Sequence, residues 1–283
     1  MKKTVGIVGA GTMGGGIAQV AALAGFEVIL HDVSGDALKA CMERIKGDLR
    51  ASMQKGKRTA AEATEALTRI RPRHAFNDLG AAGLIIEAAA EDLAVKKEIF
   101  RALDRIVAPS AVLATNTSSL SITSIGSLTK TPESVVGMHF FNPPVRMALV
   151  EIVRGSRTSD ETVGTAHETA LAMGKTPVFC SDTPGFIVNR VARPFYGEAL
   201  RILGEGTAPH EQIDRIVRLS GGFRMGPFEL MDLIGIDVNY AVTQSVYEQF
   251  FHEARFRPHP IQRRMVEAGT LGRKTGRGFY PYE

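Results

Sequence analysis

Residues 4–32 read TVGIVGAGTMGGGIAQVAALAGFEVILHD, and this stretch decides the fold. The apolar run at residues 5–8 predicts a short buried strand, and residues 17–23 predict the opening of a helix, with a turn of three glycines between them. A second apolar run, at residues 28–30, ends at Asp32. The order of strand, glycine turn, helix, strand and acid is typical of a dinucleotide-binding unit.

Each glycine of the turn has its own mechanical role. Gly9 permits a tight turn, Gly11 lets the backbone approach a pyrophosphate, and Gly14 lets the helix pack closely on the strand. Asp32 is expected to accept hydrogen bonds from the adenosine ribose hydroxyls and to repel a 2′-phosphate, which favours NAD over NADP. The alternative is a glycine turn that binds nothing. The candidate cofactor-binding residues of this stretch are Gly9, Gly11, Thr12, Met13, Gly14 and Asp32.

The composition is that of an ordinary globular protein, with 283 residues of which 44% are apolar and 23% are charged. Cys41 and Cys180 lie far apart and belong to no Cys/His cluster, so we expect no disulfide framework, no metal site and a cytoplasmic location. The strand expected at the N-terminus leaves no room for a signal peptide. No apolar run approaches the roughly 20 residues of a membrane span, so we expect no membrane partner.

The formal net charge is +4 and the sequence pI is about 9.1. Dispersed Lys and Arg side chains on a solvated surface are one interpretation. The other is a basic face that receives an anionic ligand larger than a dinucleotide alone. A nucleic acid partner is disfavoured, because no basic stripe is interleaved with aromatic residues and the chain has no Trp.

Up to about residue 181, short apolar runs alternate with helical patterns. This alternation predicts an α/β fold, with an N-terminal Rossmann-type, doubly wound and mainly parallel sheet. Residues 35–65 form a long polar segment with one apolar stripe, which we interpret as a helical excursion interrupted near Gly56. The expected strands after the first two are residues 84–86, 111–114, 135–138, 149–153 and 177–180.

The segment Asp182-Thr183-Pro184-Gly185 is the clearest break in the pattern. We predict a dinucleotide-binding domain at residues 1–184 and an all-α substrate and dimerisation domain at residues 185–283. Its predicted helices are residues 186–203, 209–219 and 230–254, with one short strand at 278–280. Apolar helices in so small a domain often dimerise, which favours a homodimer through this part of the chain.

His139 and Glu151 are the most suggestive pair for chemistry. His139 ends one expected strand, and Glu151 lies in the middle of the next, where a carboxylate is expensive to bury unless it is paired. Paired with an imidazole, the carboxylate would fix the ring tautomer and stabilise the imidazolium of a general base. A buried structural ion pair is the alternative. Asn189 also ends an apolar run, at the start of the second domain, where it either faces a substrate or caps the helix.

Several motifs in fixed order resemble the NAD-dependent 3-hydroxyacyl-CoA dehydrogenase family, in particular its single-function bacterial 3-hydroxybutyryl-CoA type. The resemblance covers the full length of the chain. The motifs are the glycine turn at 9–14, Asn116-Thr117-Ser118-Ser119, His139-Phe140-Phe141-Asn142-Pro143, residues 182–190, Gly226-Pro227-Phe228 and residues 272–280.

The resemblance implies a role for each matching residue. His139 is the catalytic base and Glu151 is its partner, while Ser118 and Asn189 bind the reacting oxygen and neighbouring groups of the substrate. Lys55 is similar to a position that contacts coenzyme A. Arg146 stands where many members carry an apolar residue, which leaves the acyl-chain preference open. The further NAD-contacting positions are Glu91, Lys96, Ser118, Asn142 and Lys274.

The activity implied by the resemblance is reversible, NAD-dependent oxidation of an (S)-3-hydroxyacyl-CoA to a 3-oxoacyl-CoA. His139 would remove the proton of the 3-hydroxyl while a hydride leaves C3. Two alternatives remain. One is a related, CoA-independent dehydrogenase of small sugar acids, of the gulonate-oxidising type. The other is a non-catalytic NAD-binding protein, as occurs among relatives of the lens crystallins.

Overall fold

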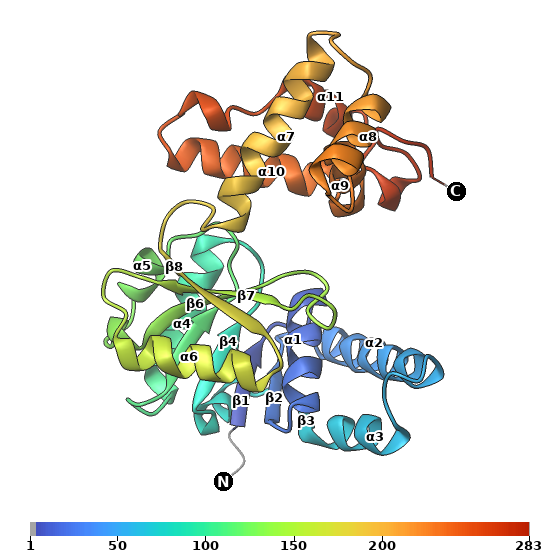
Figure 1. Ribbon diagram of the computed structural model, residues 1–283. Helices are drawn as coiled ribbons and strands as arrows, with labels where there is room; N and C mark the ends of the chain where they lie inside the picture. The colour runs from blue at the N-terminus through green and yellow to red at the C-terminus, as the bar shows by residue number, and fades with distance from the viewer. Residues whose placement is uncertain (1–3, 283) are drawn as a thin grey trace. The chain divides into compact units, whose positions relative to one another are not determined.

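An eight-stranded sheet, with the strand order β3-β2-β1-β4-β5-β6-β7-β8, forms the centre of the first of two units into which the chain divides (Figure 1). The computed structural model describes residues 4–282, and the units meet at Thr183 and Pro184. Neighbouring strands run parallel except for β6 and β7, which are antiparallel. The strands are β1 (Thr4–Val8), β2 (Glu27–His31), β3 (Ile70–Arg73), β4 (Leu84–Glu87), β5 (Val112–Thr115), β6 (Val135–Phe140), β7 (Leu149–Arg154) and β8 (Thr176–Ser181).

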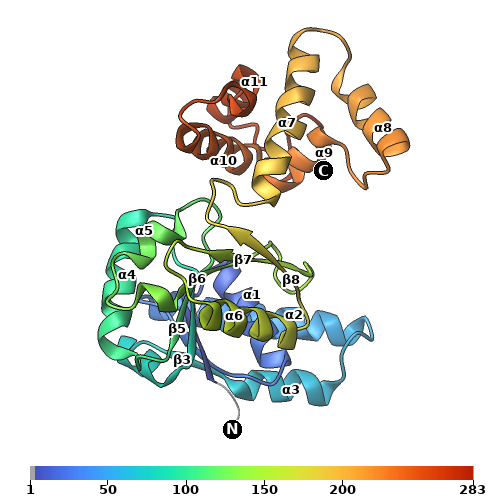
Figure 2. The ribbon, with the colours of Figure 1, turned by 60° about the vertical axis from the view of Figure 1, so that its left-hand side comes forward.

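Helices cover both faces of this sheet, which confirms the predicted doubly wound, mainly parallel architecture. One face packs against α1 (Thr12–Leu23) and α6 (Asp160–Ala172) in a single apolar core that includes Ile17 and Ala166. The other face is covered by α4 (Leu93–Ile106) and α5 (Ile122–Gly126). Figure 2 shows α4 and α5 on the opposite side of this unit from α2 and α3. The chain order reverses on either side of β1, so a crevice is expected beyond the carboxyl ends of β1 and β4.

The polar segment after β2 is a helical pair, as its interrupted pattern predicts. Helix α2 (Gly35–Gln54) buries Leu38, Cys41, Ile45 and Leu49 along one face, which is the apolar stripe of the sequence. Helix α2 ends at Gln54, and the turn that follows contains Gly56, whose φ of +64° suits a residue without a side chain. Helix α3 (Ala60–Arg69) then begins with a capping box between Thr59 and Glu62.

The second unit is built from helices and the loops between them, and its described residues include only isolated β-bridges and no named strand, in agreement with the predicted all-α domain. Its core gathers apolar side chains from three successive helices, among them Leu200, Ile213 and Phe228. Asp214 accepts hydrogen bonds at 2.9 Å from the backbone N–H groups of Phe228 and Glu229, and so caps the helix that begins there. The helices are α7 (Val188–Gly204), α8 (His210–Gly221), α9 (Pro227–Ile234), α10 (Ile236–Gln249) and α11 (Pro260–Glu267).

Two predicted elements of the second unit are wrong. The expected helix at 230–254 is divided at Gly235, whose φ of +102° separates α9 from α10. The expected strand at 278–280 does not form, because the N–H groups of Phe279 and Tyr280 bond to the carboxylate of Asp232 at 3.0 and 2.9 Å. A side chain thus satisfies the backbone donors that a neighbouring strand would otherwise satisfy.

Candidate active site

The glycine turn has the shape that a bound pyrophosphate requires. Gly9 adopts a φ of +103°, and a Cβ on Gly14 would lie 1.8 Å from the carbonyl oxygen of Gly9, so both positions exclude a side chain. A Cβ on Gly11 would meet no atom within 4 Å, which leaves open space at the N-terminus of α1. No side chain caps that terminus. Its N–H groups and helix dipole are therefore available to an anion.

Asp32 stands directly after β2 and faces the same turn. Its two carboxylate oxygens each accept one backbone hydrogen bond at 2.8 Å, from the N–H groups of Ala10 and Ser34. Each oxygen has a second lone pair, so the carboxylate can also accept hydrogen bonds from ribose hydroxyls. The turn and Asp32 together fit the predicted NAD cofactor, with the pyrophosphate at α1 and the adenosine ribose at the end of β2.

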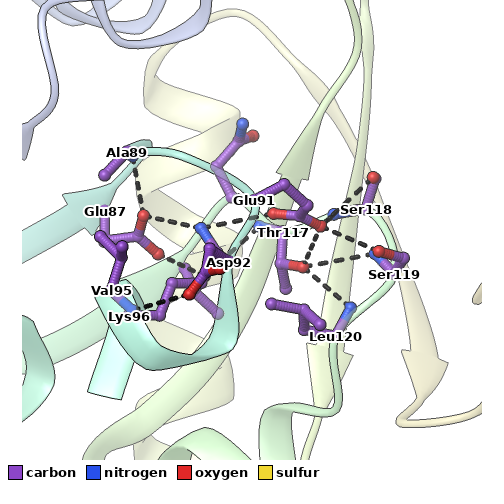
Figure 3. Close-up of polar contacts among 12 residues, drawn as sticks. Glu87, Ala89, Glu91, Asp92, Val95, Lys96, Thr117, Ser118, Ser119 and Leu120 are labelled. Atoms are coloured by element: carbon purple, nitrogen blue, oxygen red, sulfur yellow. Dashed lines mark hydrogen bonds and ion pairs between the residues drawn. The ribbon is translucent and has the colours of Figure 1, made fainter. Parts of the chain in front are cut away.

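A buried ion pair lies at the end of β4 (Figure 3). The Nζ atom of Lys96 is 2.7 Å from Oε1 of Glu87, and the two side chains are 1% and 0% exposed. Glu87 also accepts hydrogen bonds at 2.7 Å from the hydroxyl of Thr115 and the backbone N–H of Ala89. Because every partner is in place, the pair can be buried without an uncompensated charge. Lys96 is therefore held inside the first unit.

Glu91 connects this pair to the loop that follows β5 (Figure 3). Its Oε2 atom lies 3.4 Å from Nζ of Lys96, and its Oε1 atom accepts hydrogen bonds from the Thr117 hydroxyl at 2.5 Å and the Ser118 N–H at 2.9 Å. Burial raises the pKa of the Glu91 carboxyl, but Lys96 and the hydrogen bonds from residues 117–119 outweigh burial, so the pKa lies below its ordinary value. The network fixes the backbone at Ser118, one of the proposed substrate-binding residues.

His139 and Glu151 meet across the antiparallel strands β6 and β7. They are register partners in the sheet, and Nδ1 of the imidazole lies 2.7 Å from Oε2 of the carboxylate. His139 is 5% exposed and Glu151 is fully buried. The side chain of Asn116 accepts a hydrogen bond from the N–H of Phe140 at 2.9 Å, which joins the end of β5 to the residue after His139. The His–Glu pair and the Ser118 loop therefore belong to neighbouring strand ends.

The remaining predicted site residues are spread over both units. Asn142 and Arg146 are exposed in the loop between β6 and β7, and Lys55 is exposed at the end of α2. In the second unit Asn189 lies in the first turn of α7. Lys274, also in that unit, contacts both carboxylate oxygens of Asp237 at 2.5 and 2.6 Å. The first unit thus contains most of the predicted set, and Asn189 and Lys274 belong to the second.

Two residues that shape this region, Thr115 and Asp182, have no site role predicted from the sequence. Thr115 completes the partners of Glu87. Asp182 accepts hydrogen bonds from the Ser121 hydroxyl and from the N–H groups of Ile122 and Thr123, and so holds the start of α5. The available signal for both was a polar residue at the end of an apolar strand.

Two further findings concern metal-binding groups and membrane-spanning helices. Among residues 4–282, no group of three or more His, Cys, Asp or Glu side chains is arranged to hold a metal ion. In that same part of the chain, no helix combines the length and apolar character needed to cross a membrane.

Comparison with known protein families gives two matches. Residues 4–183 match the model described as 3-hydroxyacyl-CoA dehydrogenase, NAD binding domain, and residues 185–282 match 3-hydroxyacyl-CoA dehydrogenase, C-terminal domain. The two matches together account for nearly the whole chain.

Individual relatives agree with the family models. The chain is 49% identical over 280 residues to 3-hydroxyadipyl-CoA dehydrogenase of Escherichia coli, and spans 99% of its own length but 59% of that relative. It is 44% identical to a probable 3-hydroxybutyryl-CoA dehydrogenase of Bacillus subtilis, covering 99% of this chain and 98% of the relative. The crystal structure of (S)-3-hydroxybutyryl-CoA dehydrogenase from Ralstonia eutropha superposes with a TM-score of 0.96 at 42% identity, covering 100% of both chains.

Proposed function

Because the chain belongs to the 3-hydroxyacyl-CoA dehydrogenase family, we propose that it oxidises (S)-3-hydroxyacyl-CoA esters to 3-oxoacyl-CoA esters with NAD, reversibly. The single observation that carries the proposal is the buried His139–Glu151 pair. It lies in the same unit as the glycine turn and Asp32, which fit a dinucleotide. The acyl group is short, as in the 3-hydroxybutyryl esters for which the Bacillus and Ralstonia relatives are named, or another short chain.

The proposed chemistry assigns the proton to His139. The contact between Nδ1 and Glu151 favours the tautomer with its proton on Nδ1, which makes Nε2 the basic nitrogen. In the oxidation, Nε2 accepts the proton of the substrate 3-hydroxyl, and in the reduction the imidazolium returns it. Glu151 stabilises the imidazolium formed between these steps. NAD, when bound, supplies the hydride acceptor.

The other predicted residues position the reactants. Ser118, whose backbone is fixed by Glu91, and Asn189 hydrogen-bond the reacting oxygen and the groups beside it. Glu91, Lys96, Asn142 and Lys274 contact or support the coenzyme, and Lys55 binds coenzyme A. For Lys96 the burial favours support over direct contact, because its ammonium is already paired with two carboxylates.

We also propose a homodimer that forms through the second unit. Apolar side chains are exposed on and beside α8, where Ile216, Leu219 and Phe223 are 62%, 74% and 53% exposed. Such a cluster is typical of a protein interface. The mass by light scattering should be that of two chains, and Leu219→Asp should reduce it to one. Leu171→Asp, a matched change of an exposed leucine in the first unit, should leave the dimer intact. A single-chain mass for the unmodified protein would contradict the homodimer.

A cytoplasmic location is the last part of the proposal. Both cysteines, Cys41 and Cys180, are free, which suits a reducing compartment.

Consumption of NADH with acetoacetyl-CoA, beside free acetoacetate, tests the proposed activity. Rapid loss of NADH absorbance with the CoA ester alone supports the dehydrogenase. Equal turnover of the free acid would favour the CoA-independent alternative. Binding of NADH without turnover of either compound would favour a non-catalytic protein.

A further inference from the structure

Arg193 is a buried cation that has no carboxylate partner. It lies in α7, is 4% exposed, and forms no ion pair within residues 4–282. Burial lowers the pKa of its guanidinium to about 10. Burying a charge is expensive unless an opposite charge or a full set of hydrogen bonds compensates for it. The proposed mechanism does not use this residue.

The hydrogen bonds of Arg193 leave part of the guanidinium unused. Nε donates to the carbonyl of Asn189 at 3.2 Å, and Nη1 donates at 2.8 Å to the carbonyl of Asn239 and at 2.8 Å to the hydroxyl of Thr243. All three acceptors are neutral. A guanidinium has five N–H donors, so the two on Nη2 have no acceptor among the described residues.

Neighbouring groups add donors to this region and no anionic acceptor. The amide nitrogen Nδ2 of Asn239 is fully buried and also lacks a partner. The guanidinium carbon of Arg193 lies 5.1 Å from the centre of the Tyr196 ring, a cation–π contact that holds the side chain in place. An excess of positioned N–H donors around a buried cation is the arrangement that receives an anion.

The unused nitrogen is not sealed inside the domain. The fully buried side-chain atoms without a partner, among the described residues, are Gln19 Oε1, Arg69 Nε and Asn239 Nδ2. Nη2 of Arg193 does not belong to this group, so it retains some contact with the surface.

Arg193 lies one helical turn after Asn189, on the same face of α7. Four residues of α-helix advance by about 6 Å. In a six-carbon acyl chain, three carbon–carbon bonds of about 1.5 Å each separate C3 from the terminal carbon. If Asn189 contacts the substrate beside C3, a terminal carboxylate is within reach of the Arg193 side chain.

We propose that Arg193 binds the terminal carboxylate of the acyl group, so that 3-hydroxydicarboxylyl-CoA esters of about six carbons are preferred substrates. The inference rests on the proposed function, because it takes Asn189 as a substrate-binding residue. The charged hydrogen bond it adds would be made only by an ester with an anionic end.

Two esters of equal length test this inference. The rates of NADH oxidation with 3-oxoadipyl-CoA, which ends in a carboxylate, and with 3-oxohexanoyl-CoA, which ends in a methyl group, give a ratio of kcat/KM. We expect the unmodified protein to prefer the dicarboxylyl ester by at least about tenfold, and Arg193→Gln to lower the ratio by about 10- to 100-fold. Arg193→Lys, which keeps the charge, should retain part of the preference.

A matched control is Arg201→Gln, in the same helix, because Arg201 is partly exposed and paired with Glu198 at 2.9 Å. Its ratio should equal that of the unmodified protein. A ratio near one in the unmodified protein would overturn the inference, and this result does not depend on any variant folding. An unchanged ratio in Arg193→Gln would also overturn the inference. Arg193 would then have only a structural role, through its hydrogen bonds from α7 to α10. Absence of turnover with both six-carbon esters, when acetoacetyl-CoA is turned over, would overturn this inference alone, whereas absence of turnover with all three CoA esters would overturn the proposed function as well.

Discussion

The imidazole of His139 and the carboxylate of Glu151 face each other across β6 and β7, with 2.7 Å between Nδ1 and Oε2. The antiparallel register brings them together, since residues directly opposite on two strands share one face of the sheet. Strands β6 and β7 are the only antiparallel neighbours in the sheet of residues 4–282. The reversal places a general base and its carboxylate partner on consecutive strands.

Glu151→Gln tests the electrostatic part of this pair. The amide oxygen can still accept a hydrogen bond from Nδ1, but a neutral group does not stabilise the imidazolium. We expect kcat with acetoacetyl-CoA to fall about 10²- to 10³-fold while NADH binding, measured by fluorescence, is retained. Glu133→Gln, a half-exposed control in the first unit, should have normal kcat. A Glu151→Gln enzyme within threefold of normal would exclude this role.

Lys96→Met tests the buried ion pair at the end of β4. Removing the ammonium leaves Glu87 fully buried without its counter-charge, so we expect the free energy of unfolding to fall by about 3–5 kcal/mol. The double variant Glu87→Gln with Lys96→Met should recover part of the loss. The urea midpoint measures both effects, with Lys97→Met as the control. Equal stability of Lys96→Met and the control would show that the pair does not carry this energy.

Asp32→Ala tests the coenzyme preference. The substitution removes the carboxylate expected to bind the ribose hydroxyls and to repel a 2′-phosphate. We expect the KM for NADH to rise by about tenfold or more, and the activity with NADPH relative to NADH to increase. Asp36→Ala, an exposed change four residues later, should alter neither value. An unchanged ratio of the two coenzymes in Asp32→Ala would contradict the assignment.

His31 makes the stability of the first unit dependent on pH. Its ring is 3% exposed, and burial lowers its pKa, although the carbonyl of Arg73, Asp32 and Asp78 act in the opposite direction. A histidine with a lowered pKa in the folded state binds its proton more readily when unfolded. Its stabilising effect is therefore complete above the unfolded pKa of about 6.5 and is lost as the pH falls through that value toward the folded pKa.

The urea midpoint at pH 7.5 and pH 5.5 measures this effect. The decrease on acidification should be smaller in His31→Gln than in the unmodified protein. His74→Gln serves as the control, because His74 is an exposed neighbour. Identical pH dependence of His31→Gln and the unmodified protein would refute the prediction.

The sequence predicted the sheet wherever a strand is buried on both faces. The runs that became β4 and β5 are continuous and apolar, and each is fully buried. Strand β3 could not be predicted, because only Ile70 of Ile70–Arg73 is buried and its Arg-Pro-Arg sequence is typical of a loop. It pairs through backbone hydrogen bonds with the edge of β2, and these leave no hydrophobic pattern.

In the candidate site, too, some features could be predicted from the sequence and others could not. The pairing of His139 with Glu151 could be predicted, because a carboxylate inside an apolar strand requires a partner nearby. The burial of Lys96 could not, since a lysine in an amphipathic helix normally reaches solvent and its depth depends on Glu87 in another element. The burial of Arg193 could not be predicted for a similar reason. Its separation from carboxylates depends on how the helices pack and produces no sequence pattern.

Turnover by His139→Gln tests the role of His139 as general acid and base most directly. Acetoacetyl-CoA and NADH are supplied at saturating concentration, NADH oxidation is followed by absorbance, and NADH binding is titrated separately. We expect kcat to fall by about 10²- to 10⁴-fold while the affinity for NADH stays near normal. Near-normal turnover by a His139→Gln protein that binds NADH would contradict the assignment of His139 as the general acid and base.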